Sequence, residues 1–109
     1  MSSRRGEPKK KINGLPTRVV LRLYVAGNAP NSARAVANIE EICREHLTGA
    51  HDLEIIDVLE YPERAMAAGI LVTPTLAKLH PQPTAQIVGN LSDKPRVLLA
   101  IGVRSDQRE

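Results

Sequence analysis

The segment 71–79 is largely apolar and carries one proline, Pro74, near its beginning. Proline has no N–H to donate to a sheet, and it restrains the residue before it to extended backbone. Within sheets it is therefore confined to edges, bulges or the first residue of a strand. We expect a strand that begins at Pro74, and the remaining elements must supply the sheet to which this strand belongs.

Apolar patterns predict three more strands. Residues 18–25 place apolar side chains at every second position, which predicts a strand with one fully apolar face. Residues 52–60 are apolar with little alternation, a pattern typical of a central strand covered on both faces. Residues 84–89 follow a proline-rich turn, and we expect them to return antiparallel to the strand at Pro74.

Apolar residues at helical spacing, together with capping and terminating residues, predict three helices. Asn31 or Ser32 is the expected N-cap of the first, and Ser92 or Asp93 is the expected N-cap of the last. The helices are expected at residues 31–47, 63–68 and 93–101. The element order is then βαβαββα in a single α/β domain, which is the thioredoxin-like topology.

Basic residues are concentrated at the N-terminus. Residues 1–18 hold six of the 15 Lys and Arg residues but only one of the 12 Asp and Glu residues, so the rest of the chain is slightly acidic. Residues 1–17 have too little apolar surface to offset the entropy of ordering them. We predict a disordered basic tail at 1–17, a domain at 18–103 and a polar tail at 104–109.

The basic tail suggests nucleic acid as an alternative partner, since clustered Lys and Arg release counterions from phosphates. The tail has no interleaved aromatic residues, and the domain beside it is not basic. We therefore expect no nucleic-acid partner.

Cysteine usage and hydropathy indicate the compartment. The chain has one cysteine, which cannot form an intramolecular disulfide, and no apolar run follows the basic N-terminus to serve as a signal peptide. No stretch approaches the roughly 20 apolar residues that span a bilayer. We expect a cytoplasmic protein that has no membrane association.

The loop after the first predicted strand argues against dithiol catalysis. Thioredoxins carry Cys-x-x-Cys at the start of their first helix, where the helix dipole lowers the thiol pKa. Residues 28–31 here read Asn-Ala-Pro-Asn. Cys43 falls on the apolar stripe of the helix, so we interpret it as a core residue. We expect no enzyme active site and no cofactor.

Other polar residues carry little chemistry. His46, His51 and His80 form no i, i+4 pair on a helix, and no second cysteine joins them, so we expect no metal site. Asp57 ends a predicted strand. We interpret it as a hydrogen-bonded strand-end acid, with a buried acid of raised pKa as the less common alternative.

Four segments match a known pattern in order and spacing: Leu23–Ser32, Ile56–Leu59, Thr73–Lys78 and Gly89–Asp93. Together they resemble the KaiB family, the small partner proteins of the KaiC clock ATPase. The resemblance runs from about residue 18 to residue 101. The chain departs from the family in its basic N-terminal tail, its short C-terminus and Asn90, where the family usually has Asp.

The resemblance implies a metamorphic protein. KaiB proteins have a ground-state fold, βαββααβ, that assembles into tetramers, and a rarer thioredoxin-like monomer that binds KaiC. In cyanobacteria the bound form also sequesters KaiA and competes with the thioredoxin-like domain of the kinase SasA. By resemblance we expect a non-enzymatic clock or timer regulator that binds a KaiC-type hexameric ATPase and modulates its phosphorylation cycle. KaiA and a SasA-like kinase pathway are further candidate partners.

The resemblance also implies functional positions. Asn28, Pro30 and Arg34 are expected to bind the partner, with Lys78 nearby, although Arg34 and Lys78 are also consistent with plain solvation. The fold-switch region is expected to include Thr73, Pro74, Gly89, Asn90, Ser92, Asp93 and Ala100.

Ala100 bears on which fold is populated. It stands where cyanobacterial members often have Gly, and Ala is favoured over Gly in a helix by roughly 1 kcal/mol. We therefore expect this chain to populate the thioredoxin-like monomer more than those relatives do. A thiol-less thioredoxin-like module that binds a peptide or glutathione beside Pro74 is the alternative from another functional class.

Overall fold

A computed structural model describes residues 18–47 and 51–103. The tails predicted at 1–17 and 104–109 lie outside the described residues. The elements are, in order, β2 (Val19–Val25), α1 (Pro30–His46), β3 (His51–Asp57), α2 (Pro62–Ala67), β4 (Thr75–His80), β5 (Ala85–Val88) and α3 (Lys94–Ile101). This order is βαβαββα, so the predicted thioredoxin-like topology is confirmed.

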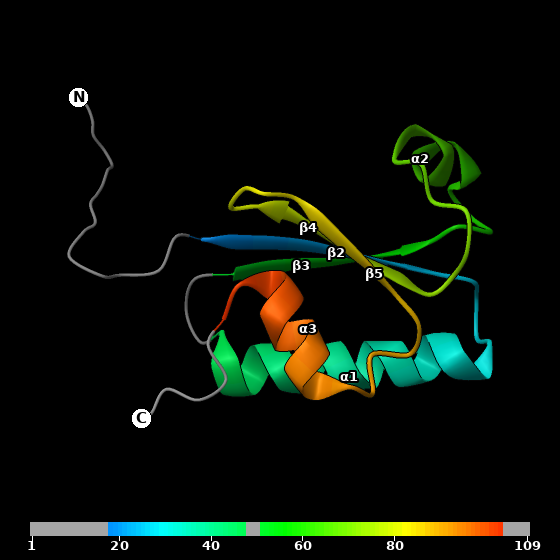
Figure 1. Ribbon diagram of the computed structural model, residues 1–109. Coiled ribbons are helices and arrows are strands. Elements are labelled where there is room, and N and C mark those ends of the chain that lie inside the picture. Colours follow the sequence, from blue (N-terminus) through cyan, green and yellow to red (C-terminus); the bar gives the residue numbers. More distant parts are fainter. Residues whose placement is uncertain (1–17, 48–50, 104–109) are drawn as a thin grey trace.

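The strands form one mixed sheet in the order β3-β2-β4-β5 (Figure 1). Strands β2 and β3 are parallel, and β4 is antiparallel to both β2 and β5. The prediction that residues 52–60 form a central strand is wrong, because β3 lies at the edge of the described sheet. Its side chains differ in exposure: Ile56 is buried, whereas Ile55 is 41% exposed. An apolar run indicates that a strand packs against other elements on the faces of the sheet. It does not indicate whether the strand lies at the centre or at the edge.

The helices divide between the two faces of the sheet. Helices α1 and α3 cover one face, and α2 lies on the other (Figure 1). The larger core lies under α1 and α3, where the alternating residues of β2 meet Ile39 of α1 and Val97 of α3. A smaller core lies under α2 and contains Tyr24, Ile56 and Ala65. The predicted apolar face of the first strand is confirmed.

The connections into α1 and α3 use different capping chemistry. Helix α1 begins at Pro30 after Ala29, which makes no side-chain cap, so the predicted Asn31 or Ser32 cap is wrong. The Ser32 hydroxyl instead accepts a hydrogen bond from the Ala26 N–H at 3.1 Å. In α3 the predicted cap is confirmed, because the Asp93 carboxylate accepts from the Arg96 N–H at 3.3 Å.

Pro74 directly precedes β4, as its chemistry predicts, and the Thr73–Pro74 peptide is cis. The apolar segment 71–79 is only partly strand, since Leu71 and Val72 precede β4 and are exposed. The Thr75 hydroxyl donates to the Val72 carbonyl at 2.7 Å, which folds the chain back just before the strand begins.

Candidate partner-binding surface

Three loops meet at one end of the sheet. The parallel strands β2 and β3 both finish there, and the Val58 N–H donates to the Val25 carbonyl at 2.8 Å. Strand β4 starts at the same end, because Thr75 pairs with Tyr24. In open α/β sheets, ligands bind outside the carboxyl ends of the parallel strands. We call the loops 26–29, 58–61 and 70–74 at this end the loop surface.

Loop 26–29 is held in one conformation by its own backbone. Gly27 has a φ of 55°, which a residue without a Cβ adopts at little cost. The Ala29 N–H donates to the Ala26 carbonyl at 3.2 Å and closes the turn. Asn28, on the loop surface, and Pro30, at the start of α1 beside it, are both exposed, so two of the residues expected to bind the partner are accessible.

Arg34 lies one turn after the start of α1 and is exposed. Its guanidinium donates to the Asn31 side-chain oxygen at 3.2 Å. This single local bond leaves most guanidinium donors available to a partner, since arginine has five N–H groups. Arg34 therefore adds a cation beside the residues of loop 26–29.

Lys78 does not join this surface. It is only 6% exposed and lies on the face of β4 covered by α3, as Leu76 does. Its Nζ is 3.9 Å from the position that a Cβ on Gly102 would take, so the ammonium lies at the C-terminal end of α3. The structure groups Asn28, Pro30 and Arg34, but it separates Lys78 from them.

Exposed apolar side chains gather on the loop surface, which sequence patterns did not predict. Leu59 is 72% exposed and Leu71 is 94% exposed. Leu71 and Val72 line a hollow of about 180 Å³ with Val58 and Ile70. The sequence held one local signal of this exposure. Pro74 sets the start of β4, so Leu71 and Val72 lie before the strand and do not share its burial. The exposed apolar residues of the loop surface and the adjoining α2 are Leu59, Tyr61, Met66, Leu71 and Val72.

Ion pairs fix α2 beside the loop surface. The Glu54 carboxylate accepts from both Nη atoms of Arg64, at 2.8 and 3.0 Å, and lies 3.2 Å from the Nε of Arg22. The Arg64 hydrogen bonds are the main reason that the pKa of Glu54 lies below its usual range. The pair joins α2 to β3 beside the loop surface.

This surface has no pair of cysteines that could carry out dithiol chemistry, because the two cysteine positions of the Cys-x-x-Cys motif hold Asn28 and Asn31. The single thiol, Cys43, is buried in the main core, which confirms the prediction that it packs there. Burial raises the pKa of this thiol to about 11, and the nearby Glu40 carboxylate adds to the shift. A thiol of that pKa is almost entirely protonated near neutral pH and is a poor nucleophile.

Metal ligands do not cluster in the part of the chain that the structure describes. Among residues 18–47 and 51–103, no three His, Cys, Asp or Glu side chains gather as a metal site would require. No helix within those same ranges has both the length and the apolar character needed to cross a membrane.

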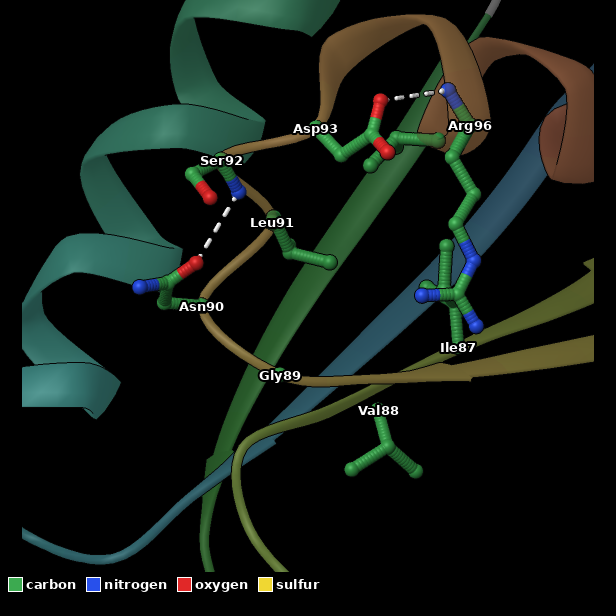
Figure 2. A pocket seen from close by; sticks show the side chains of 9 residues that line it. Ile87, Val88, Gly89, Asn90, Leu91, Ser92, Asp93 and Arg96 are labelled. Carbon is green, nitrogen blue, oxygen red and sulfur yellow. Dashed lines mark hydrogen bonds between the residues drawn. The ribbon is translucent and has the colours of Figure 1, made fainter.

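The segment between β5 and α3 contains most of the positions expected to switch fold. Figure 2 shows its pocket of about 90 Å³, which Val88, Arg96 and the loop 89–93 help to line. The Gly89 N–H donates to the Pro74 carbonyl at 3.0 Å, so the two parts of the expected switch region are in direct contact. The Ser92 N–H donates to the Asn90 side-chain oxygen at 3.0 Å (Figure 2).

Asn90 and Leu91 fix this segment against α1. The Asn38 amide donates to the Asn90 carbonyl at 2.8 Å. Leu91 follows with a φ of 66° and a side chain that is buried in the main core. A left-handed leucine costs roughly 1 to 2 kcal/mol, so burial of its side chain must hold the backbone in that conformation.

Comparisons with known proteins agree with this architecture. Residues 22–103 match the KaiB domain family model. The chain is 49% identical over 86 residues to the circadian clock protein KaiB3 of Synechocystis sp. (strain ATCC 27184 / PCC 6803 / Kazusa), covering 79% of this chain and 84% of that protein. It is 47% identical over 88 residues to the circadian clock oscillator protein KaiB of Prochlorococcus marinus strain MIT 9313, covering 81% of this chain and 74% of that protein.

Solved structures with this fold are more distant in sequence. The N-terminal domain of Synechococcus elongatus SasA has a TM-score of 0.65 at 21% identity, covering 87% of this chain and 93% of that domain. The thioredoxin of Fasciola hepatica has a TM-score of 0.62 at 16% identity, covering 75% of this chain and 78% of that protein. These likenesses show a thioredoxin-like fold. The family match over residues 22–103 and the identity to curated clock proteins show that the chain belongs to the KaiB family.

Proposed function

We propose that this protein is a non-enzymatic clock or timer regulator that acts by binding a KaiC-type hexameric ATPase. The observation that carries the proposal is the KaiB family match over residues 22–103, which includes the whole loop surface. The buried, poorly nucleophilic Cys43 supports a binding role over thiol chemistry.

The loop surface supplies the contact in this proposal. Its exposed apolar residues would form the centre of the interface, with Asn28 and Arg34 as polar contacts at its rim. Interfaces of this kind combine an apolar core with a polar rim, and arginine is enriched in them. Lys78 makes no direct contact with the partner in this proposal, because it is buried beneath α3.

A slow change of fold is the second part of the proposal. The thioredoxin-like form would bind KaiC, and a βαββααβ form would self-associate to a tetramer. The segment that changes would include Thr73, Pro74 and the loop 89–93, which already contact each other through the Gly89–Pro74 hydrogen bond.

Ala100 offers a direct test of that balance. It lies inside α3, where Gly would lower helix stability by roughly 1 kcal/mol. Size-exclusion chromatography with light scattering should show mainly monomer for the wild type and more tetramer for Ala100→Gly. A persistent wild-type tetramer at low micromolar concentration would contradict the proposed preference for the monomer.

KaiA and a SasA-like kinase are proposed as further members of the pathway. The SasA N-terminal domain shares this fold, which supports competition for one site on KaiC. Mixing the protein, a KaiC hexamer and that domain should release the domain from KaiC as the protein binds. Retention of the domain at saturating protein would mean that the two bind different sites.

Binding itself is tested by co-elution. The purified protein and a KaiC from the same organism are incubated with ADP or with ATP, and samples are separated at intervals over a day. We expect a complex that forms over hours. Absence of co-elution with either nucleotide would refute the proposed partner.

A further inference from the structure

Asp57 occupies the junction between two loops of the loop surface. One oxygen of its carboxylate, Oδ1, accepts from the Gly27 N–H at 3.0 Å and from the Leu59 N–H at 2.9 Å. Its main-chain carbonyl accepts from the Glu60 and Tyr61 N–H groups at 3.0 and 2.9 Å. One residue at the end of β3 thus binds loop 26–29 and loop 58–61 at once.

The two loops also touch where the side chain of Leu59 meets the backbone of Gly27. A Cβ on Gly27 would lie 3.3 Å from Cδ1 of Leu59, so the leucine rests against the backbone of the glycine. That contact uses the space left by the missing side chain. Leu59 nevertheless remains 72% exposed, so most of its surface is available to a partner.

We propose that Asp57 is a positioning residue that presents Leu59 as an apolar anchor for the partner. The inference rests on the proposed function, since it concerns the same loop surface. The carboxylate acts through the two N–H groups from which it accepts. In the free protein it therefore holds Leu59 against Gly27 in the geometry that the complex requires.

The physical reason is preorganisation. Without the shared acceptor, the two loops would have to be ordered when the partner binds, and that ordering would weaken association. Two hydrogen bonds converge on one carboxylate oxygen here, and removing that acceptor would leave two N–H groups without their partner. A small set of fixed apolar anchors usually carries most of the affinity of an interface.

The test compares Asp57→Ala with Asp57→Asn. Asparagine keeps an Oδ1 acceptor of the same shape, whereas alanine removes it. In Asp57→Ala we expect KaiC affinity to fall about 10-fold or more and exchange of the Gly27 and Leu59 amide hydrogens to accelerate about 10- to 100-fold. In Asp57→Asn both quantities should stay within about threefold of wild type.

Asp52→Ala is the matched control. It removes the same kind of side chain from the same strand, where Asp52 pairs with Arg18 at 2.8 Å and not with the loops. Its KaiC affinity should equal that of wild type. Equal loss of affinity in Asp57→Asn and Asp57→Ala would overturn the inference, because the charge and not the acceptor would then be required.

Leu59→Ala keeps the test informative if Asp57→Ala does not fold. It truncates an exposed side chain, so the fold should persist while KaiC affinity falls about 10-fold. Unchanged affinity would overturn the anchor role. If wild type itself does not bind KaiC, the proposed function fails, yet the amide exchange in the Asp57 variants still decides whether the carboxylate positions the loops.

Discussion

The two halves of the domain differ in how many of their residues adopt an unfavourable backbone conformation or lie in an unfavourable environment. In the half formed by β2, α1 and β3, the only described residue with positive φ is Gly27. In the half formed by β4, β5 and α3, Leu91 is left-handed and Lys78 is buried. Both features cost free energy, and both lie against the short helix α3. The second half should therefore open at lower free energy than the first.

Lys78 shows how the difference arises. Among the described residues, no side-chain hydrogen bond or ion pair includes it. The nearest feature that stabilises its positive charge is the C-terminal end of α3, whose partial negative charge favours a cation. That effect reaches at most about 2 kcal/mol, whereas burying an ammonium costs several kcal/mol. The buried lysine is thus a net cost to this packing.

Two truncations of core side chains test this difference between the halves, and they should have the largest effect on stability. Ile39 in α1 and Ile101 in α3 are both almost fully buried, and Ile→Ala typically costs about 2–5 kcal/mol. Native-state hydrogen exchange should show that Ile39→Ala lowers protection throughout the sheet, whereas Ile101→Ala lowers it mainly in β5 and α3. Equal loss in both halves from Ile101→Ala would show that the molecule opens as one unit.

Lys78→Met should stabilise the second half. Methionine keeps a long unbranched side chain under α3 and removes the buried charge. We expect the free energy of unfolding in urea to rise by about 1–3 kcal/mol, since replacing buried charges by apolar residues is often stabilising by that amount. A loss of stability would mean that the ammonium supports α3 by more than it costs.

The two helix starts give a smaller contrast. Asp93→Ala removes the side-chain cap of α3 and should cost about 1 kcal/mol. Asn31→Ala in α1 removes only a surface hydrogen bond to Arg34, and the expected loss is about 0.3 kcal/mol. Thermal unfolding of both variants beside wild type measures the difference. Equal losses would contradict the capping assignments.

The smallest expected effect concerns the pH dependence of an ion pair on the surface between α1 and α3. Lys94 of α3 donates to Glu45 of α1 at 2.9 Å, and this hydrogen bond holds the pKa of Glu45 below its usual range. A lowered carboxyl pKa adds stability above the usual value of about 4.3, and that stability is lost as pH falls through the lowered value. Titration by NMR should show the pKa of Glu45 rising towards the usual range in Lys94→Met. An unchanged pKa would show that Lys94 does not stabilise the ionised carboxylate of Glu45.

Sequence patterns predicted the parts of the fold that depend on local chemistry. The alternation in β2, the Asp93 cap and the packing of Cys43 each follow from a few neighbouring residues. The place of β3 at the sheet edge did not follow, because strand order depends on long-range pairing. The family resemblance placed Lys78 near the partner residues, and its burial beneath α3 did not follow from the sequence because it depends on long-range packing.

The candidate site was predicted in part for the same reason. Asn28 and Arg34 were expected to bind the partner because of the family resemblance, and both side chains are exposed. The apolar members were not found: Leu71 looked like strand, and Leu59 looked like the end of a buried run. Pro74 was a local signal that Leu71 precedes the strand, whereas the exposure of Leu59 is visible only once the loops are assembled.

The most direct measurement is KaiC binding by a pair of charge reversals on α1. Arg34→Glu changes the exposed arginine beside the loop surface, and Arg44→Glu makes the same change near the far end of the helix. Titration against a KaiC hexamer by light scattering should give about 10-fold weaker binding for Arg34→Glu and wild-type affinity for Arg44→Glu. Equal affinities for the two variants would contradict binding through the loop surface.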